Sequence, residues 1–281
     1  MKVQVPMKYL ILSGGLGNQM FEYAFYLSCK NKGIKLKLNR DLYEVSRMHN
    51  GYLLGHVFGV PESEVTKSSK LSVFITRIIH RYHPAHLVYS DTPMMFSEKA
   101  FRTNRIFIDG CFINPLYFES IRELISKAFV FREIDSYNMC LGERMLSDNS
   151  VSIHIRRGDY LNNPVYGVCN EDYYEKAIRH IEKQVSNPSF FVFSDDLEWS
   201  DKLMRYLGVN YKLITINTGV DSYKDMYLMT RCRHNIIANS TFSWWGAWLN
   251  NNPGKIVIAP NKWTTSIYMD KTEDCWNQLE V

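Results

Sequence analysis

The chain has 281 residues, 46% of them hydrophobic, which is enough material for the core of one or two globular domains. A formal net charge of +4, without any tract rich in Lys and Arg, gives no support to a nucleic-acid-binding protein. No apolar run is long enough for a membrane-spanning helix, and the short run at 9–12 does not have the form of a secretory signal, so we expect a cytoplasmic protein.

The first predicted elements are a strand, a glycine-rich turn, a helix and a second strand. Residues 8–13 and 34–39 read as the strands, and apolar residues recur at helical spacing between them. The glycines at 14–17 leave backbone N–H groups bare at the helix start, as in a Rossmann opening. Met20 stands where the dinucleotide fingerprint has its third glycine. Asn18 could reach a ligand from this turn; the alternative is that the glycines only let the helix pack closely on the sheet.

Residues 41–105 are less regular, apart from one amphipathic helix expected at 70–86. We interpret its apolar stripe as a face packed on the core. The alternative interpretation is a peripheral contact with the inner membrane. The stripe consists of Leu71, Phe74, Ile75, Ile78 and Ile79.

Neither the histidines nor the cysteines predict a metal site. His80, His83 and His86 are spaced by three, but Pro84 breaks the helix between them. The six cysteines are scattered and form no CxxC pair, so neither a zinc site nor a disulfide framework is indicated. We therefore expect reduced thiols and no metal ligands.

The second half of the chain has a regular alternation of strands and helices. A strand at 105–110 and a helix at 114–131 precede it, and the polar segment 133–150 is expected to link two domains, 1–140 and 141–281. Five strands alternating with four helices then indicate a parallel, doubly wound α/β sheet. The strands are expected near 151–156, 189–194, 211–216, 235–239 and 255–259, and the helices at 171–186, 197–207, 221–232 and 242–250.

The first strand of this half ends in Arg156, Arg157, Gly158 and Asp159. In α/β sheets, the carboxyl ends of the strands are where ligands bind. Two guanidinium groups at such an end favour a multiply charged oxyanion, because Arg offers paired planar donors that match a phosphate. The alternative is an ordinary cluster of surface ion pairs.

Two further strand ends carry polar side chains. Asp195 and Asp196 are adjacent and point in different directions, so capping of the next helix is favoured over metal binding. Ser240, Thr241 and Ser243 stand at the start of another helix, where hydroxyls are ordinary caps and can also form a phosphate cradle. The tryptophans that follow them are more typical of a core than of a sugar platform.

Four segments, in this order and spacing, resemble the bacterial α-1,2-fucosyltransferases of glycosyltransferase family eleven: GGLGNQMFEYA, HIRRGDY, FSDD and NSTFSWWGAWL. The resemblance implies the GT-B fold, with two Rossmann-like domains facing a central cleft. Residues 1–140 would bind the acceptor and 141–281 the donor, with an alternative in which the tail packs back on the first domain. It also implies a metal-independent transferase without a cofactor.

The reaction implied by the resemblance is transfer of L-fucose from GDP-β-L-fucose to the 2-hydroxyl of a terminal β-galactose, with inversion. Arg156 would stabilise the charge on the leaving β-phosphate. Asp159, ahead of His154, is the candidate base, and Asp159 could equally position Arg156. The other expected donor contacts are Gly17 and Asn18 at the diphosphate, Asp225 at guanine, Asp196, and the hydroxyls of Ser240, Thr241 and Ser243. Asn18 is also a candidate catalytic residue.

One departure and three alternatives accompany this resemblance. Family members often have two aromatics and a Gln after the glycine near residue 110, where this chain has Cys111 to Asn114, so acceptor choice could differ. The alternatives are a GDP-fucose transferase of another linkage, a Rossmann-type oxidoreductase and a carbohydrate-binding module. The tryptophan segment argues against the first, the missing third glycine against the second, and the paired arginines against the third.

Overall fold

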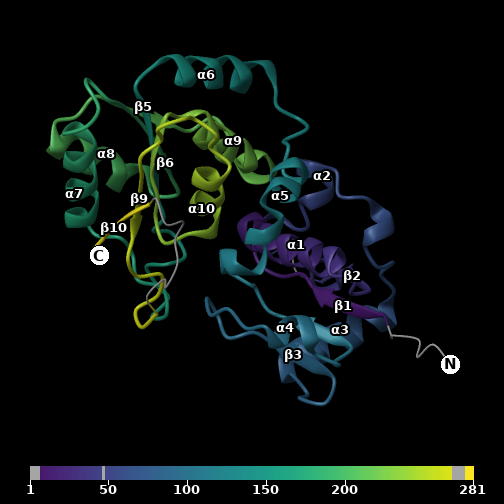
Figure 1. The fold of residues 1–281 in the computed structure, drawn as a ribbon. Coiled ribbons are helices and arrows are strands. Elements are labelled where there is room, and N and C mark those ends of the chain that lie inside the picture. The colour runs from purple at the N-terminus through teal and green to yellow at the C-terminus, as the bar shows by residue number, and fades with distance from the viewer. Residues whose placement is uncertain (1–6, 46–47, 268–275) are drawn as a thin grey trace. The chain divides into compact units, whose positions relative to one another are not determined.

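The computed structural model describes residues 7–45, 48–267 and 276–281, and it divides the chain into two compact units (Figure 1). The units are residues 1–133 and 134–281, so the boundary falls before residue 134 instead of after residue 140. Each unit has its own parallel sheet with helices packed on it. This is the α/β class that the alternating pattern predicted.

The first unit contains a four-stranded sheet in the order β2-β1-β4-β3, with every pair parallel. The predicted Rossmann-like opening is confirmed, since β1 is followed by the glycine turn, α1 and β2. The register places Ile11 beside both Asn39 and Asp109, so these strands end at one edge. The elements are β1 (Lys8–Ile11), α1 (Leu16–Asn31), β2 (Leu36–Asn39), β3 (Val88–Ser90) and β4 (Phe107–Asp109).

The helix predicted at 114–131 is wrong over most of its length. Only α5 (Arg122–Ala128) is an α-helix, and two short 3₁₀ turns precede it. Burial of aromatic rings explains the break: Phe118 packs against Phe21 with ring centroids 6.0 Å apart, and Tyr117 meets Phe25 edge-on at 5.4 Å. The apolar spacing therefore reflected contacts with α1 and not a continuous helix. The other short helices of this unit are α2 (Leu54–Phe58) and α4 (Lys99–Arg102).

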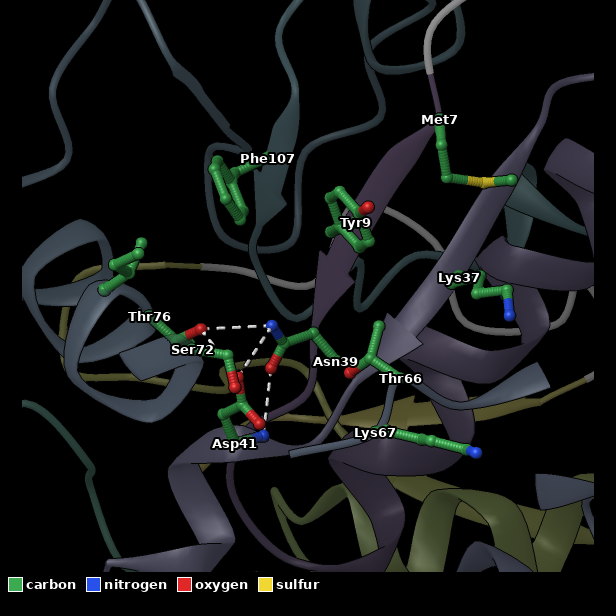
Figure 2. Close-up of a pocket in the computed structure, with 11 residues that line it drawn as sticks. Met7, Tyr9, Lys37, Asn39, Asp41, Thr66, Lys67, Ser72, Thr76 and Phe107 are labelled. Atoms are coloured by element: carbon green, nitrogen blue, oxygen red, sulfur yellow. Dashed lines mark hydrogen bonds between the residues drawn. The ribbon is translucent and has the colours of Figure 1, made fainter. Parts of the chain in front are cut away.

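Helix α3 (Lys70–Tyr82) forms as predicted, but the prediction that its apolar stripe packs on the core is wrong. Four stripe residues are 40% to 67% exposed, and among the described residues of the helix only Thr76 and Ile79 are buried. A polar network fixes this orientation, as Figure 2 shows: Asn39 Nδ2 donates to Thr76 Oγ1 at 3.0 Å, and that hydroxyl donates to Asp41 at 3.1 Å. These hydrogen bonds turn Thr76, instead of the stripe, toward the sheet.

The second unit contains a six-stranded parallel sheet in the order β10-β9-β8-β5-β6-β7. The predicted strands and helices are found in the predicted order, with small shifts at their ends. The strands are β5 (Ser150–Ile155), β6 (Ser189–Ser194), β7 (Tyr211–Ile214), β8 (His234–Ile236), β9 (Val257–Pro260) and β10 (Asn277–Leu279). The helices are α7 (Glu171–Glu182), α8 (Leu197–Leu207), α9 (Tyr223–Arg231) and α10 (Thr241–Trp248).

Two segments of this unit differ from the sequence-based expectation. The presumed linker contains α6 (Ser136–Ser147), which Asp135 caps by accepting a hydrogen bond from Asn138 N at 3.0 Å. Leu141 and Met145 of α6 are buried against the core. At the other end of the chain, β10 pairs with β9 and so extends the second sheet.

Candidate functional site

The site in the second unit lies where the order of strands reverses. β5 and β8 are neighbours in the middle of the sheet, the chain continues from β5 to β6 on one side, and β8 is followed by β9 on the other. In open α/β sheets, this switch point is where ligands bind, outside the carboxyl ends of the strands. The loop that begins at Arg156 follows β5, and the segment leading to α10 follows β8. The fold therefore brings these two sequence segments together.

Arg156 is held between two carboxylates. One guanidinium nitrogen lies 2.7 Å from Asp159 Oδ1 on the same loop, and another lies 2.9 Å from Asp195 Oδ2, just beyond β6. The Tyr160 ring lies under the guanidinium, 5.5 Å from its centroid. The arginine side chain is still 29% exposed, so it is braced in one place while remaining open to a ligand.

Asp195 braces the whole loop, which the sequence reasoning did not foresee. Besides its ion pair with Arg156, it accepts a hydrogen bond from the backbone N–H of Arg157 at 2.8 Å. Gly158 leaves room for this carboxylate, because a Cβ at that position would lie 2.8 Å from Asp195 Oδ2 and one of the two would have to shift. The signal was present as a carboxylate directly after a strand, but its partner on the neighbouring loop could not be read from spacing.

Arg157 has a structural role that differs from that of its neighbour. Its Nε lies 3.1 Å from Asp196 Oδ2, and its guanidinium stacks 4.0 Å over the Trp199 ring. Asp196 also caps α8 by accepting a hydrogen bond from Trp199 N at 3.1 Å, which confirms the capping interpretation for this carboxylate. Both interactions occupy Asp196 within the fold, so its expected contact with GDP stays a prediction.

The hydroxyls after β8 surround the start of α10. Ser240 caps the helix by accepting from Phe242 N at 3.3 Å, and the buried Ser243 hydroxyl donates to Ser240 O at 3.3 Å. Thr241 is half-buried at the first helical position, beside the N–H groups of the first turn. The positive end of the helix dipole thus lies at the switch point, next to the loop of Arg156. The predicted core role of the tryptophans is confirmed, since Trp244, Trp245 and Trp248 are all buried.

His154 does not fit the role of a base. It lies within β5 and is buried, with its ring centroid 5.8 Å from that of Phe242. Burial and the adjacent charge of Arg156 lower the pKa of its imidazole to about 3. A buried ring with so low a pKa is a weak proton acceptor, so His154 is a poor candidate for the base. Asp159 is half-exposed and remains the base candidate, although its ion pair shows that it positions Arg156.

Asp225 lies in the first turn of α9 and accepts a hydrogen bond from Asn217 Nδ2 at 2.7 Å. Asn217 in turn exchanges two hydrogen bonds of 3.0 Å with the side chain of Asn138 in α6. Burial raises the pKa of the Asp225 carboxyl to about 7. A carboxylate under this desolvation penalty gains from a ligand that donates hydrogen bonds, such as the N1 and N2 edge of guanine.

Gly17 and Asn18 begin α1 in the first unit. Asn18 is half-buried, and its amide nitrogen lies 3.7 Å from Cys111 Sγ. The adjacent Gln19 is fully committed to the fold, because its amide donates to Gly14 O and Gly51 O and accepts from Leu53 N. Asn18 is therefore the amide of this turn that is better placed to meet a ligand.

The comparison with known proteins decides the family. A family model described as Glycosyl transferase family 11 matches residues 7–279. This chain belongs to glycosyltransferase family 11. An α-1,2-colitosyltransferase of Escherichia coli is 33% identical, over 96% of this chain and 97% of that protein.

Two further relatives of this family 11 protein are informative. The galactoside 2-α-L-fucosyltransferase Sec1 of Mus musculus is 32% identical, but over only 40% of this chain and 31% of that protein. The crystal structure of the α-1,6-fucosyltransferase NodZ, soaked with GDP-fucose, matches with a TM-score of 0.52 at 16% identity, over 89% of this chain and 97% of NodZ. That likeness concerns the fold, and it confirms the predicted class of two Rossmann-like units.

The carboxyl edge of the first sheet gathers acidic side chains that sequence reasoning did not single out in this family 11 protein. Glu22 on α1 is buried and accepts from Ser13 N, and burial raises its pKa well above the usual value. Asp91 follows β3 and accepts from Phe112 N at 3.0 Å; burial raises its pKa to about 6.

Asn114, at the departure from the family pattern, donates to Met94 O at 3.0 Å and is buried. Its side chain therefore supports the loop.

Proposed function

We propose that this protein transfers L-fucose from GDP-β-L-fucose to the 2-hydroxyl of a terminal β-galactose, with inversion at the sugar carbon. The observation that carries the proposal is Arg156, which two carboxylates hold at the switch point of the second sheet. Membership of glycosyltransferase family 11 and the α-1,2 linkage in the name of a 33% identical relative support it.

The chemistry asks for stabilisation of a leaving diphosphate. As the glycosidic bond breaks, negative charge develops on the β-phosphate, and donors that are already oriented toward it lower the barrier. Arg156 has five N–H donors, of which its two carboxylate partners engage only part. The N–H groups at the start of α10 and the Thr241 hydroxyl add further donors from the neighbouring strand end. Because these groups supply the countercharge, the proposed transfer requires no divalent metal at the diphosphate.

We assign three further roles as part of this proposal. Asp225 would read the donor edge of guanine, and Gly17 and Asn18 would approach the diphosphate from the first unit. Asp159 holds Arg156 and, as the base candidate that is half-exposed, would accept the proton of the attacking hydroxyl. A loose, oxocarbenium-like transition state places only a modest demand on that base.

A second donor is favoured by one specific observation, the colitosyltransferase among the relatives. Colitose is the 3-deoxy analogue of L-fucose, so the two donors differ by one hydroxyl. An enzyme that hydrogen-bonds this hydroxyl rejects the deoxy sugar strongly, whereas an apolar pocket does not. We expect GDP-L-fucose to be the better donor.

The deciding experiment measures GDP release from GDP-L-fucose and GDP-colitose, with and without lactose or N-acetyllactosamine, in the presence of EDTA. Acceptor-dependent release with GDP-L-fucose, and a 2-linked product by NMR, is the expected result. Faster release with GDP-colitose would show that colitose, and not L-fucose, is the sugar that this enzyme transfers. Binding of NAD instead of GDP in a calorimetric titration would overturn the transferase assignment of this site.

We further propose that α3 docks on an anionic membrane surface while the acceptor is used. None of the helices within the described residues is long and apolar enough to cross a bilayer. The exposed apolar stripe of α3 is accompanied by Lys70, Arg77 and Arg81, and the helix has no acidic residue. Beneath it is a cavity of about 510 Å³ whose lining includes Ile75 of the stripe and two lysines, Lys37 and Lys67 (Figure 2). On the helix itself the apolar face is flanked by cationic residues and by no acidic one, which is complementary to an anionic lipid surface.

Vesicle sedimentation tests this contact. The full chain should pellet with vesicles of phosphatidylglycerol and phosphatidylethanolamine, and far less with phosphatidylcholine alone. A Phe74→Ser/Ile78→Ser variant should stay in the supernatant, whereas Leu124→Ser, which changes an exposed leucine of α5, should behave as the wild type. Equal pelleting of the double variant, or a stripe-dependent dimer by analytical ultracentrifugation, would contradict the proposal.

A further inference from the structure

Two histidines and an aspartate converge at the carboxyl edge of the first sheet. His80 Nδ1 lies 2.7 Å from Asp109 Oδ2, and His83 Nε2 lies 2.9 Å from the same oxygen. The two imidazole rings are nearly perpendicular, at 87°, with centroids 5.8 Å apart. Among the described residues, this is the one group of three His, Cys, Asp or Glu side chains whose ligand atoms all lie within 4.8 Å of one another.

The local backbone explains why this cluster was not predicted. Helix α3 does end before Pro84, as the sequence indicated. His83 then adopts a left-handed conformation, with φ of 40° and ψ of 58°, and this turn brings its ring back beside that of His80. The third member, Asp109, is the last residue of β4 and is distant in sequence. The proline that argued against a helical ligand pair therefore does not separate the rings.

Burial and charge at this edge favour a bound cation. The Asp109 side chain is only 4% exposed, whereas His80 and His83 are 40% and 46% exposed, so the cluster is anchored inside and open on one side. Asp91 and Glu22 lie close enough for the charge of Asp109 to raise the pKa of each, after the larger effect of burial. Three carboxyl groups thus share a poorly solvated edge, and a divalent ion would offset their mutual repulsion.

We propose that His80, His83 and Asp109 bind a divalent transition metal, with zinc as the ion that best matches them. Two imidazole nitrogens and one carboxylate oxygen are typical zinc ligands, whereas magnesium and calcium prefer oxygen throughout. Tetrahedral zinc with bonds near 2.0 Å separates its ligand atoms by about 3.3 Å, so each ring has to withdraw by roughly half an ångström. Both rings lie at the half-exposed end of α3, where such a shift is small, and water can complete the coordination.

The bound ion would fasten the end of α3 to β4. A metal that binds only the folded state raises the ratio of folded to unfolded protein. When the free metal concentration is 100 times the dissociation constant, that ratio rises about 100-fold. The site is formed within the first unit alone, apart from Arg156 and its partners in the second unit. None of the three ligands is a residue to which the proposed transfer assigns a role, and removal of the metal should loosen α3 from β4.

The test uses the full chain without a histidine tag, freed of metal with EDTA that is then removed. Titration with Co²⁺ should give the intense visible absorption of a tetrahedral site at one equivalent, and Zn²⁺ should displace it. His80→Gln and His83→Gln should each weaken binding about 100-fold or more, since even partners of metal ligands contribute 10- to 100-fold. His86→Gln changes a histidine of the same loop outside the cluster and is the matched control.

The outcomes separate clearly. Loss of binding in both cluster variants, with circular dichroism unchanged and the His86→Gln control intact, is the expected result. Unchanged Zn²⁺ affinity in the two variants, or no stoichiometric binding by the wild type, would show that the cluster is only a hydrogen-bonded pair of histidines on a carboxylate. Because the readout is metal stoichiometry, this failure would leave the transfer proposal untouched, and absence of transfer would leave the metal result untouched.

Discussion

Replacing Arg156 by Ala should abolish most of the activity while leaving the fold intact. Removal of one preorganised donor from a developing oxyanion typically lowers kcat by about 10²- to 10³-fold, or roughly 3–4 kcal/mol of transition-state stabilisation. The structural loss is smaller, because the two ion pairs of Arg156 are partly exposed and each contributes about 0.2–1 kcal/mol. We therefore expect the melting temperature to fall by only a few degrees.

The adjacent Arg157 offers a matched control. Its side chain is 15% exposed, pairs with Asp196 and stacks on Trp199, so Arg157→Ala removes packing as well as charge. That variant should lose about 1–2 kcal/mol of stability while its kcat changes less than about tenfold. The proposed roles therefore predict the larger loss of kcat for Arg156→Ala and the larger loss of stability for Arg157→Ala.

The assay is GDP release at saturating acceptor, combined with circular dichroism melting and calorimetric titration with GDP. Arg156→Lys keeps the charge without the planar pair of donors and should fall between the wild type and Arg156→Ala. If folded Arg156→Ala retains kcat/KM within threefold of the wild type, the assignment of this arginine to the leaving group is refuted. A larger kcat loss in Arg157→Ala than in Arg156→Ala would refute it equally.

Two further predictions concern Asp225 and Asp195. Burial raises the pKa of Asp225 to about 7, so its ionised fraction should increase about tenfold per pH unit below pH 7. If the ionised form binds guanine as proposed, the affinity for GDP-fucose should follow this fraction and level off above that pH. The pKa of Asp225 in the folded protein lies above its value in the unfolded chain, so this residue lowers the free energy of unfolding as pH rises from about 4 to 7. The Asp225→Asn variant should remove the pH dependence of GDP-fucose binding in calorimetry. It should also have a higher melting temperature than the wild type at pH 8. Asp195→Ala removes one of the two carboxylate partners of Arg156 and the acceptor of Arg157 N. It should lower kcat about tenfold with little effect on the affinity for GDP, because a misplaced donor weakens stabilisation of the transition state. Unchanged kcat would show that Asp195 only supports the loop.

The strand ends could be predicted because their signals are local. Alternation in the segment before Arg156 identifies β5, and the family resemblance implied that Arg156 and Ser240 contact the same donor; the pairing of β5 with β8 brings the two strand ends together. The orientation of α3 could not be predicted in the same way. Periodicity shows which residues share a face of a helix, but the Asn39, Asp41 and Thr76 network determines which face meets the sheet. That network joins residues distant in sequence.

Strand β10, helix α6 and the contacts between loops were not predicted, because each depends on residues that meet only in the fold. Strand β10 has three residues, too few for alternation to mark it, and it forms because β9 offers an unpaired edge. Helix α6 lies in a segment with polar residues at both ends, so that segment resembled a linker, although Leu141 and Met145 pack in the core. Likewise the pairing of Asp195 with Arg156, and of Asp109 with two histidines, depends on loops that meet only in the fold.

The organisation of the arginine loop has a consequence for how the site would work. Arg156 follows β5, one of its carboxylate partners follows β6, and the helix start beside it follows β8, so three adjacent strands fix the geometry. A guanidinium fixed in this way has already given up its rotational freedom in the folded protein, and little reorganisation remains when charge develops on a ligand. The carboxylates also limit the positive charge of the empty site, so a ligand must offer more than a single negative charge to compete with them. A diphosphate satisfies that condition, whereas a lone carboxylate does not.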